Sequence, residues 1–128
     1  MLPPTRLRIF KMNTMNEVTS ASPSENLVSL IGELRATTRK SETKTGALMV
    51  RRVISIARHW TDQDGRLIED YDDFELSSWG GVAERMLEIS TGSLVRVRGR
   101  VKVERWVDGA ETKSAVRIAA EHVQVLCF

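Results

Sequence analysis

The sequence predicts an all-β protein with one short helix, and three features of the chain support this fold class. Segments that alternate apolar and polar residues, or that are rich in β-branched residues, recur between residues 26 and 126. Two Asp-Gly pairs, at residues 64–65 and 108–109, have the composition of tight hairpin turns. Apolar side chains at a helical spacing occur over residues 82–89.

The composition is that of one globular domain. The chain has 128 residues, of which 41% are hydrophobic and 28% are charged, and this length needs no metal or disulfide to stabilise a core. No apolar run approaches the roughly 20 residues that a membrane-spanning helix requires. The single cysteine, Cys127, excludes an internal disulfide and argues against a cysteine-based zinc site. We therefore expect a reducing, intracellular setting.

Residues 1–25 are expected to form a flexible arm outside the folded domain, which spans residues 26–128. All 3 prolines of the chain lie in this arm, together with a cluster of Ser and Thr. Its first sixteen residues contain Arg and Lys but no acid, which weakly resembles an organelle transit peptide. A start codon upstream of Met12 or Met15 explains the same residues without a targeting role.

The first three strands are expected between Asn26 and Trp79. From Asn26 apolar and polar residues alternate, and Gly32 within this strand indicates a bulge or a barrel corner. Residues 37–46 are polar and basic and predict a loop, whereas Leu48–Trp60 is rich in β-branched residues and predicts a second strand. The Asp-Gly pair that follows predicts a hairpin turn into the third strand, Leu67–Trp79.

One short helix and two further strands complete the domain. Val82, Met86 and Ile89 recur at a helical spacing. A fourth strand is expected over Leu94–Trp106 and a fifth over Thr112–Leu126. The order β-β-β-α-β-β is that of a five-stranded Greek-key barrel with a helix between its third and fourth strands, which is the OB-fold arrangement.

The fourth strand carries the clearest functional signal. Because alternate strand residues share a face, one face of this strand is mainly valine. The other face carries Arg96, Arg98, Arg100, Lys102, Glu104 and Trp106. Neighbouring like charges repel each other, and a polyanion lying along the row would relieve that repulsion. A solvated strand face is the structural alternative, but the register of Trp106 with the cations favours polyanion binding.

The tryptophans point in the same direction. The chain has 3 of them, Trp60, Trp79 and Trp106, each at or near the end of a predicted strand. Bases stack on aromatic rings for about 1–3 kcal/mol each with little sequence preference, while cationic grooves follow the phosphates. Any one of these rings could belong to the core, but the three together favour binding to single-stranded nucleic acid.

Four stretches of the chain carry a family resemblance. They are residues 26–34 (NLVSLIGEL), 57–60 (ARHW), 79–84 (WGGVAE) and 92–100 (GSLVRVRGR), the last of which is followed by Trp106. From residue 26 to residue 126 the chain resembles the bacterial and organellar single-stranded DNA-binding protein family. The resemblance implies an OB-fold that assembles as a homotetramer, or as a dimer in some relatives, and that wraps single-stranded DNA.

The resemblance also implies a site and a role. By position, Trp60, Trp79 and Trp106 match the family's base-stacking aromatic residues. Phosphate contacts are expected from cations of the second and fourth strands, namely Arg51, Arg52, Arg58, Arg96, Arg98, Arg100, Lys102 and Arg105. The expected function is sequence-independent binding and protection of single-stranded DNA in replication, recombination or repair. The protein is expected in the cytoplasm, associated with the nucleoid, or in an organelle if the arm is a transit peptide.

The chain departs from the family's usual pattern in two places. Many members have a further stacking Trp near the start of the third strand, where the nearest aromatic residue here is Phe74. Alternation places Phe74 on the face opposite Trp79, so we expect it in the core, and Tyr71, in phase with Trp79, is the better candidate. Usual members also continue into a glycine-rich tail with an acidic end that recruits partner enzymes. The sequence ends at Phe128, so recruitment of replication or repair proteins by such a tail is not expected.

Catalysis is not expected. His59 and His122 are the only histidines, and no nucleophile triad, phosphate loop or metal-ligand spacing accompanies them. The acidic stretch Asp62–Glu75 is either a solvated hairpin or a protein-facing edge, and its carboxylates would need to converge in a pocket to hold a cation. We expect no cofactor and no metal. Two alternatives stay open: a replication-restart accessory OB protein that acts mainly through protein contacts, and a barrel that binds RNA.

Overall fold

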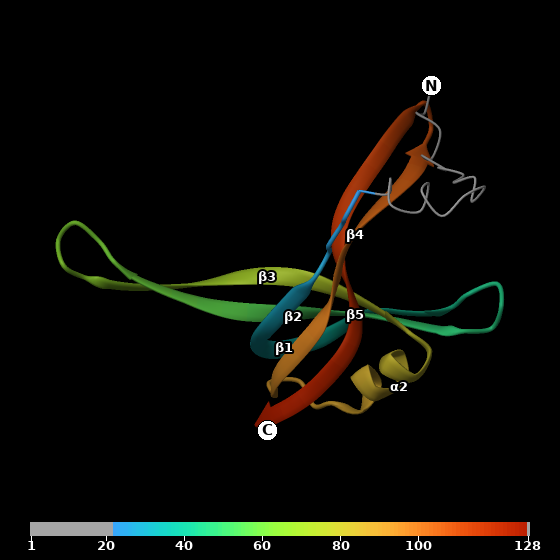
Figure 1. Ribbon diagram of the computed structural model, residues 1–128. Coiled ribbons are helices and arrows are strands. Elements are labelled where there is room, and N and C mark those ends of the chain that lie inside the picture. Colours follow the sequence, from blue (N-terminus) through green and yellow to red (C-terminus); the bar gives the residue numbers. More distant parts are fainter. Residues whose placement is uncertain (1–21, 128) are drawn as a thin grey trace.

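Five strands and one helix make up residues 22–127, the part of the chain that the computed structural model describes (Figure 1). They are β1 (Val28–Glu42), β2 (Leu48–Thr61), β3 (Leu67–Trp79), α2 (Gly80–Glu88), β4 (Leu94–Asp108) and β5 (Glu111–Cys127). The strands close a barrel in the order β1-β2-β3-β5-β4, and all neighbours are antiparallel except β3 and β5. The predicted OB-fold order, with the helix between β3 and β4, is confirmed. The prediction of a flexible arm over residues 1–25 falls almost entirely outside the described residues.

The barrel interior is built from the inward-facing residues of the strands, and α2 covers one end of it (Figure 1). Because side chains on a strand alternate between faces, each strand contributes every second residue to the core. The fully enclosed members are aliphatic side chains and one methionine, namely Leu34, Val50, Ile54, Leu76, Ala83, Met86, Val95 and Val97. Met86 and Ile89, predicted on the apolar face of the helix, are both buried. Among the described residues no helix is long and apolar enough to cross a membrane.

Glycines stand where strands approach too closely for a side chain. A Cβ atom on Gly99 would lie 1.9 Å from the carbonyl oxygen of Ala119, next to the point where the pairing of β4 with β5 shifts register. A Cβ on Gly32 would lie 2.5 Å from the carbonyl oxygen of Ser55. Gly32 precedes Glu33, the residue at which β1 passes from pairing with β4 to pairing with β2. The corner predicted at Gly32 is confirmed.

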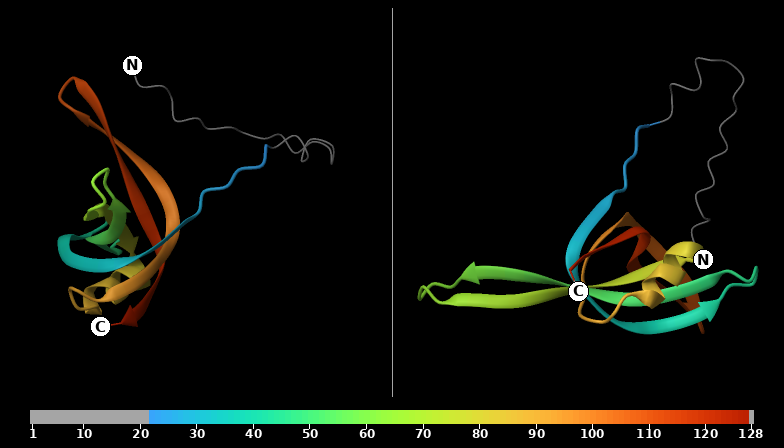
Figure 2. Two further views of the ribbon diagram at one scale, coloured as in Figure 1. Left: turned by 90° about the vertical axis from the view of Figure 1, so that its left-hand side faces the viewer. Right: turned by 90° about the horizontal axis from the view of Figure 1, so that it is seen from below.

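Three hairpins extend beyond the barrel in different directions (Figures 1 and 2). The loop predicted over residues 37–46 is wrong for most of its length, because β1 continues to Glu42 and pairs with β2 as far as Leu48. This part of β1 leaves the barrel, so neither of its faces needs apolar residues. Its polar sequence therefore resembles that of a loop although its backbone is paired.

Arg52 is part of the interior rather than of the surface. Its side chain lies on the core-facing side of β2 and only 3% of its surface is exposed. Its guanidinium donates hydrogen bonds to the carbonyl oxygens of Arg35 at 2.8 Å, Met86 at 2.5 Å and Ile89 at 2.6 Å. The last two oxygens lie at the C-terminal end of α2, where carbonyls lack helical partners and cations are favoured. Burial lowers the pKa of Arg52, and the residue leaves the set of candidate phosphate contacts.

The substitution Arg52→Met is expected to lower the free energy of unfolding by about 2 kcal/mol, because it leaves buried carbonyl oxygens without a donor. Chemical denaturation measures this loss. Arg100→Met, which removes an exposed arginine from β4, is the control and is expected to change stability by less than about 0.5 kcal/mol. Equal stability of the two variants would contradict a structural role for Arg52.

Candidate nucleic-acid interface

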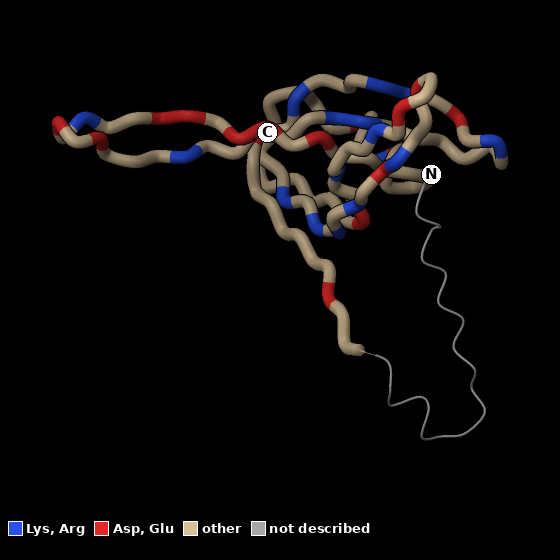
Figure 3. Tube along the Cα trace, turned by 90° about the horizontal axis from the view of Figure 1, so that it is seen from above, with Lys and Arg blue, Asp and Glu red and all other residues tan. Residues whose placement is uncertain are grey.

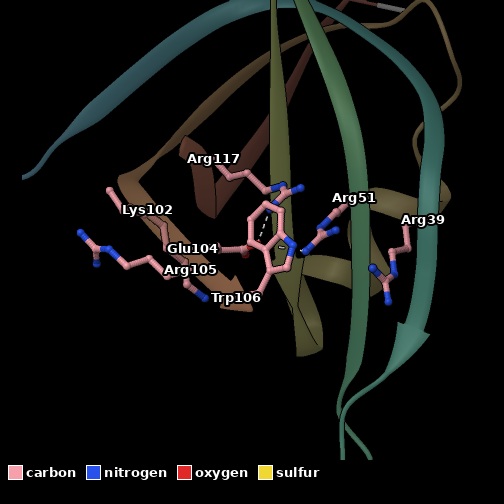
Figure 4. Close-up of a pocket in the computed structure, with 8 residues that line it drawn as sticks. Arg39, Arg51, Lys102, Glu104, Arg105, Trp106 and Arg117 are labelled. Atoms are coloured by element: carbon pink, nitrogen blue, oxygen red, sulfur yellow. Dashed lines mark hydrogen bonds and ion pairs between the residues drawn. The ribbon is translucent and has the colours of Figure 1, made fainter. Parts of the chain in front are cut away.

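Strands β1, β2, β4 and β5 together line an open groove of about 620 Å³ (Figure 4). Its lining residues are Arg39, Arg51, Lys102, Val103, Glu104, Arg105, Trp106 and Arg117. Lys102, Glu104 and Trp106 come from the row predicted on the fourth strand, and Arg117 pairs with Lys102 across the β4–β5 ladder. The ring of Trp106 lies over the groove and 43% of its surface is exposed.

A network of two arginines and two glutamates forms part of this surface. Arg51 donates to Glu104 at 3.2 Å, and Arg117 also donates to Glu104. Glu75 on β3 accepts from Arg117 Nε at 2.9 Å and lies 3.6 Å from Arg51 Nε. Three of the side chains are largely enclosed, with 16% of Arg51, 17% of Arg117 and 19% of Glu104 exposed. Burial alone would lower the pKa of Arg117, but the hydrogen bond and charge of Glu75 and the charge of Glu104 raise it.

The other groove cations have no such partners. Within residues 22–127 no carboxylate lies within ion-pair distance of Arg39, Lys102 or Arg105. The Lys102 ammonium instead lies 4.4 Å from the ring centre of Trp79, in a cation–π contact. Trp79 ends β3 and is half-buried. Lys102 therefore contacts the ring of Trp79 and lies on the same strand face as Trp106.

Trp60 lies outside the groove, on the hairpin that β2 and β3 form beyond the barrel. It pairs with Ile68, one pair before the end of the ladder, and 41% of its surface is exposed. Arg58 lies 5.1 Å from its ring centre and is bound by carboxylates, at 2.8 Å from Asp72 and 3.4 Å from Asp70. Acidic residues dominate this hairpin in Figure 3. The structure thus places Trp60 and Arg58 in a less cationic environment than Trp79 and Trp106.

The row of cations on β4 is divided between two places. Arg96 and Arg98 pair with Gln124 and His122 of β5, and these four residues line a second, smaller hollow of about 320 Å³. The valine face predicted for this strand is buried only within the barrel. Val95 and Val97 are in the core, whereas 38% of Val101 and 45% of Val103 are exposed because β4 leaves the barrel after Gly99 (Figure 1).

Two aromatic residues of β3 differ in outcome. Phe74, expected in the core, is not buried: it pairs with the core residue Ile54, but 39% of its surface is exposed, because apolar burial on β3 begins only at Leu76. Tyr71 shares the phase of Trp79, and its hydroxyl donates to Glu69 at 2.9 Å. That hydrogen bond raises the pKa of Tyr71. The acidic neighbour makes Tyr71 a poor position for a phosphate-bearing strand.

Arg117 and Glu75 belong to the site although neither was predicted from the sequence. The signal for Arg117 is present in the sequence, since it precedes the buried Ile118 on a strand and therefore lies on the opposite face. Glu75 belongs to the acidic stretch of the third strand, and nothing in the sequence separates it from the solvated carboxylates around it. Its role depends on the crossing of β3 and β5, which are parallel neighbours only at Leu76–Ile118 and Ser77–Ala119.

The sequence and the fold were compared with those of known proteins. A single-stranded DNA-binding protein of Aquifex aeolicus (strain VF5) is 30% identical over 102 residues, which are 79% of this chain and 69% of that protein. The corresponding protein of Treponema pallidum (strain Nichols) is 28% identical over 79% of this chain and 57% of its own length. The chain therefore spans between about half and two thirds of these relatives.

Solved structures of similar fold also include single-stranded DNA-binding proteins. A deletion mutant of the single-stranded DNA-binding protein from Thermus aquaticus superposes with a TM-score of 0.68 at 28% identity, over 80% of this chain and 50% of that one. A Plasmodium falciparum SSB, solved in complex with single-stranded DNA, has a TM-score of 0.69 at 15% identity over 84% of this chain and 98% of that one, and shows likeness of fold alone. Residues 25–126 match the Single-strand binding protein family. The match covers most of the chain, which therefore belongs to the single-strand binding protein family.

Proposed function

We propose that this chain binds single-stranded DNA without sequence preference and without catalysis, and that it protects single strands during replication, recombination or repair. The observation that carries the proposal is the groove beside β4, where an exposed indole lies among cations from four strands. Family membership, and a similar fold in a protein solved with single-stranded DNA, support it. The comparisons do not favour the alternative of a replication-restart accessory protein.

The groove suggests separate places for bases and phosphates. Trp106 offers a stacking surface, and Trp79 offers a second one once Lys102 moves from its ring. Arg39, Lys102 and Arg105, which have no carboxylate partner among the described residues, are the proposed phosphate contacts of the groove. Trp60 would stack a base farther along the strand, on the β2–β3 hairpin, with a smaller contribution because Asp70 and Asp72 lie beside it.

Fluorescence anisotropy of a labelled thymine homopolymer tests this function. We expect saturable binding that weakens as salt rises, and we expect unlabelled single strands to compete far better than duplex of equal length. Equal competition by duplex would favour a general polyanion site. Competition by an RNA homopolymer would measure the preference between the two sugars.

We propose Arg98, beside the second hollow, as a further phosphate contact. Arg98→Ala is therefore expected to reduce the slope of log Kd against log salt by less than one unit, about 0.7. Arg66→Ala is the matched control: it also removes one positive charge, but Arg66 is bound to Asp62 and Asp64 at the tip of the β2–β3 hairpin. An equal change of slope in both variants would show an effect of net charge rather than of the Arg98 contact.

We further propose that the chain self-associates, most simply as a tetramer. Large apolar side chains remain exposed on neighbouring strands of the barrel wall, with 44% of Ile31 and 40% of Leu94 accessible. These residues lie on β1 and β4, whose ladder runs from Val28 to Glu33. The mass from light scattering tests this proposal, since a monomer at micromolar concentration would contradict it and a dimer would favour the smaller assembly.

A further inference from the structure

Two largely enclosed cations of the groove are engaged by carboxylates. Arg51 and Arg117 alternate with Glu75 and Glu104, so that each guanidinium has a carboxylate on two sides. In Figure 4 the ring of Trp106 lies in front of the contacts of Glu104 with Arg51 and Arg117. The proposed phosphate-binding groove thus has one carboxylate, Glu104, in its lining and a second, Glu75, in contact with the same arginines.

A carboxylate and a phosphate offer a guanidinium the same kind of partner. Both present two oxygen acceptors in a plane that matches the fork of an arginine. Arginine keeps its charge in proteins, so its donors are always available to whichever anion approaches. A phosphate that reaches Arg51 or Arg117 must therefore displace Glu104 or Glu75, or lie beside them against their repulsion.

The strands do not depend on these carboxylates for their pairing. Glu104 lies opposite Ala115 within an unbroken part of the β4–β5 ladder, and Glu75 lies opposite Val53 in the continuous β2–β3 ladder. Enclosed ion pairs contribute little net stability, because the loss of hydration offsets much of the attraction. Stability alone is therefore a weak reason for two carboxylates at this place.

We propose that Glu104, assisted by Glu75, occupies in the free protein the place that a DNA phosphate takes in the complex, and so limits affinity for single strands. The inference rests on the proposed function. The two glutamates are affinity-determining residues of the groove: they keep Arg51 and Arg117 oriented toward it, and they make each phosphate compete for them. Because part of the protein's charge is internally neutralised, fewer counterions are released on binding, and the salt dependence is shallower than the number of arginines implies.

Glu104→Gln tests the proposal with little change of shape. Its matched control is Glu111→Gln, which changes net charge equally at an exposed position that pairs with Asp108 at the tip of the β4–β5 hairpin. At about 0.1 M salt we expect Glu104→Gln to bind a thymine homopolymer about tenfold more tightly than wild type. We also expect its salt slope to steepen by less than one unit, about 0.7, because the phosphate then binds arginines that Glu104 no longer neutralises. The control is expected to change affinity by less than about twofold.

The outcomes separate this proposal from the proposed function. If wild type does not bind the homopolymer, the proposed function fails. If wild type binds and Glu104→Gln matches the Glu111→Gln control, or binds more weakly with an unchanged melting temperature, the competition by Glu104 is overturned and the function stands. If Glu104→Gln does not fold, Glu75→Gln decides by the same criterion, because 37% of Glu75 is exposed and it contacts the same two arginines.

Discussion

The double substitution Trp79→Ala/Trp106→Ala is expected to weaken binding of a thymine homopolymer by about 2–6 kcal/mol, a loss of about 30-fold or more. Each indole offers a stacking surface worth about 1–3 kcal/mol per base. Trp106 is exposed over the groove, and Trp79 lies under Lys102. Anisotropy titration of wild type and variant under identical salt measures the difference.

Trp60→Ala is the matched comparison for the double substitution, because it removes an equally exposed indole outside the groove. Trp60 is as exposed as Trp106, 41% against 43%, but it lies on the acidic hairpin outside the groove. We expect its removal to weaken binding by less than removal of either Trp79 or Trp106. If the double variant kept full affinity while folded, base stacking on these indoles would be refuted. A larger loss of affinity from Trp60→Ala alone would indicate that the single strand binds along the β2–β3 hairpin instead.

Gly99→Ala is expected to lower the free energy of unfolding by about 3 kcal/mol or more, which is the upper range for overpacking. The added Cβ would lie 1.9 Å from the carbonyl oxygen of Ala119, far inside contact distance. Relief requires β4 and β5 to separate at the register shift of their ladder, within the wall of the closed barrel. Thermal unfolding would show the loss as a fall in Tm of roughly 10 °C or more.

Gly81→Ala serves as the control for this substitution. A Cβ at Gly81 meets no atom within 4 Å, and Gly81 lies in the first turn of α2. Because alanine favours helices more than glycine does, we expect stability to be unchanged or slightly raised. Equal destabilisation of both variants would show that the close contact at Gly99 relaxes at little cost.

The fold was predictable where a strand or helix has one face in the core. Val95 and Val97 alternate with cations, and Met86 and Ile89 follow a helical period, because burial selects apolar residues at those positions. The same rule fails outside the barrel. Residues 37–42 are paired but exposed on both faces, so no alternation marks them as a strand.

The candidate site was predictable in its row of residues but not in its cross-strand contacts. Lys102 and Trp106 share a phase, and the structure places both at the groove. Arg52 is next to Arg51 in sequence, but alternation turns one to the groove and the other to the interior. The sequence does not reveal that carbonyl oxygens of α2 accept hydrogen bonds from Arg52 in the interior. Nor does it reveal that Glu75 of β3 and Arg117 of β5 form an ion pair. Such contacts depend on how the barrel closes.

The most direct test of the account is a tryptophan-fluorescence titration of the wild-type protein with a thymine homopolymer, at low and at moderate salt, with duplex DNA as the control. Stacking of bases on exposed indoles predicts strong quenching by the single strand, weaker binding at the higher salt, and little change with duplex. The saturation point would give the number of nucleotides bound per chain. Absence of quenching at low salt would contradict the account, because it would mean that Trp79 and Trp106 do not stack on the bases.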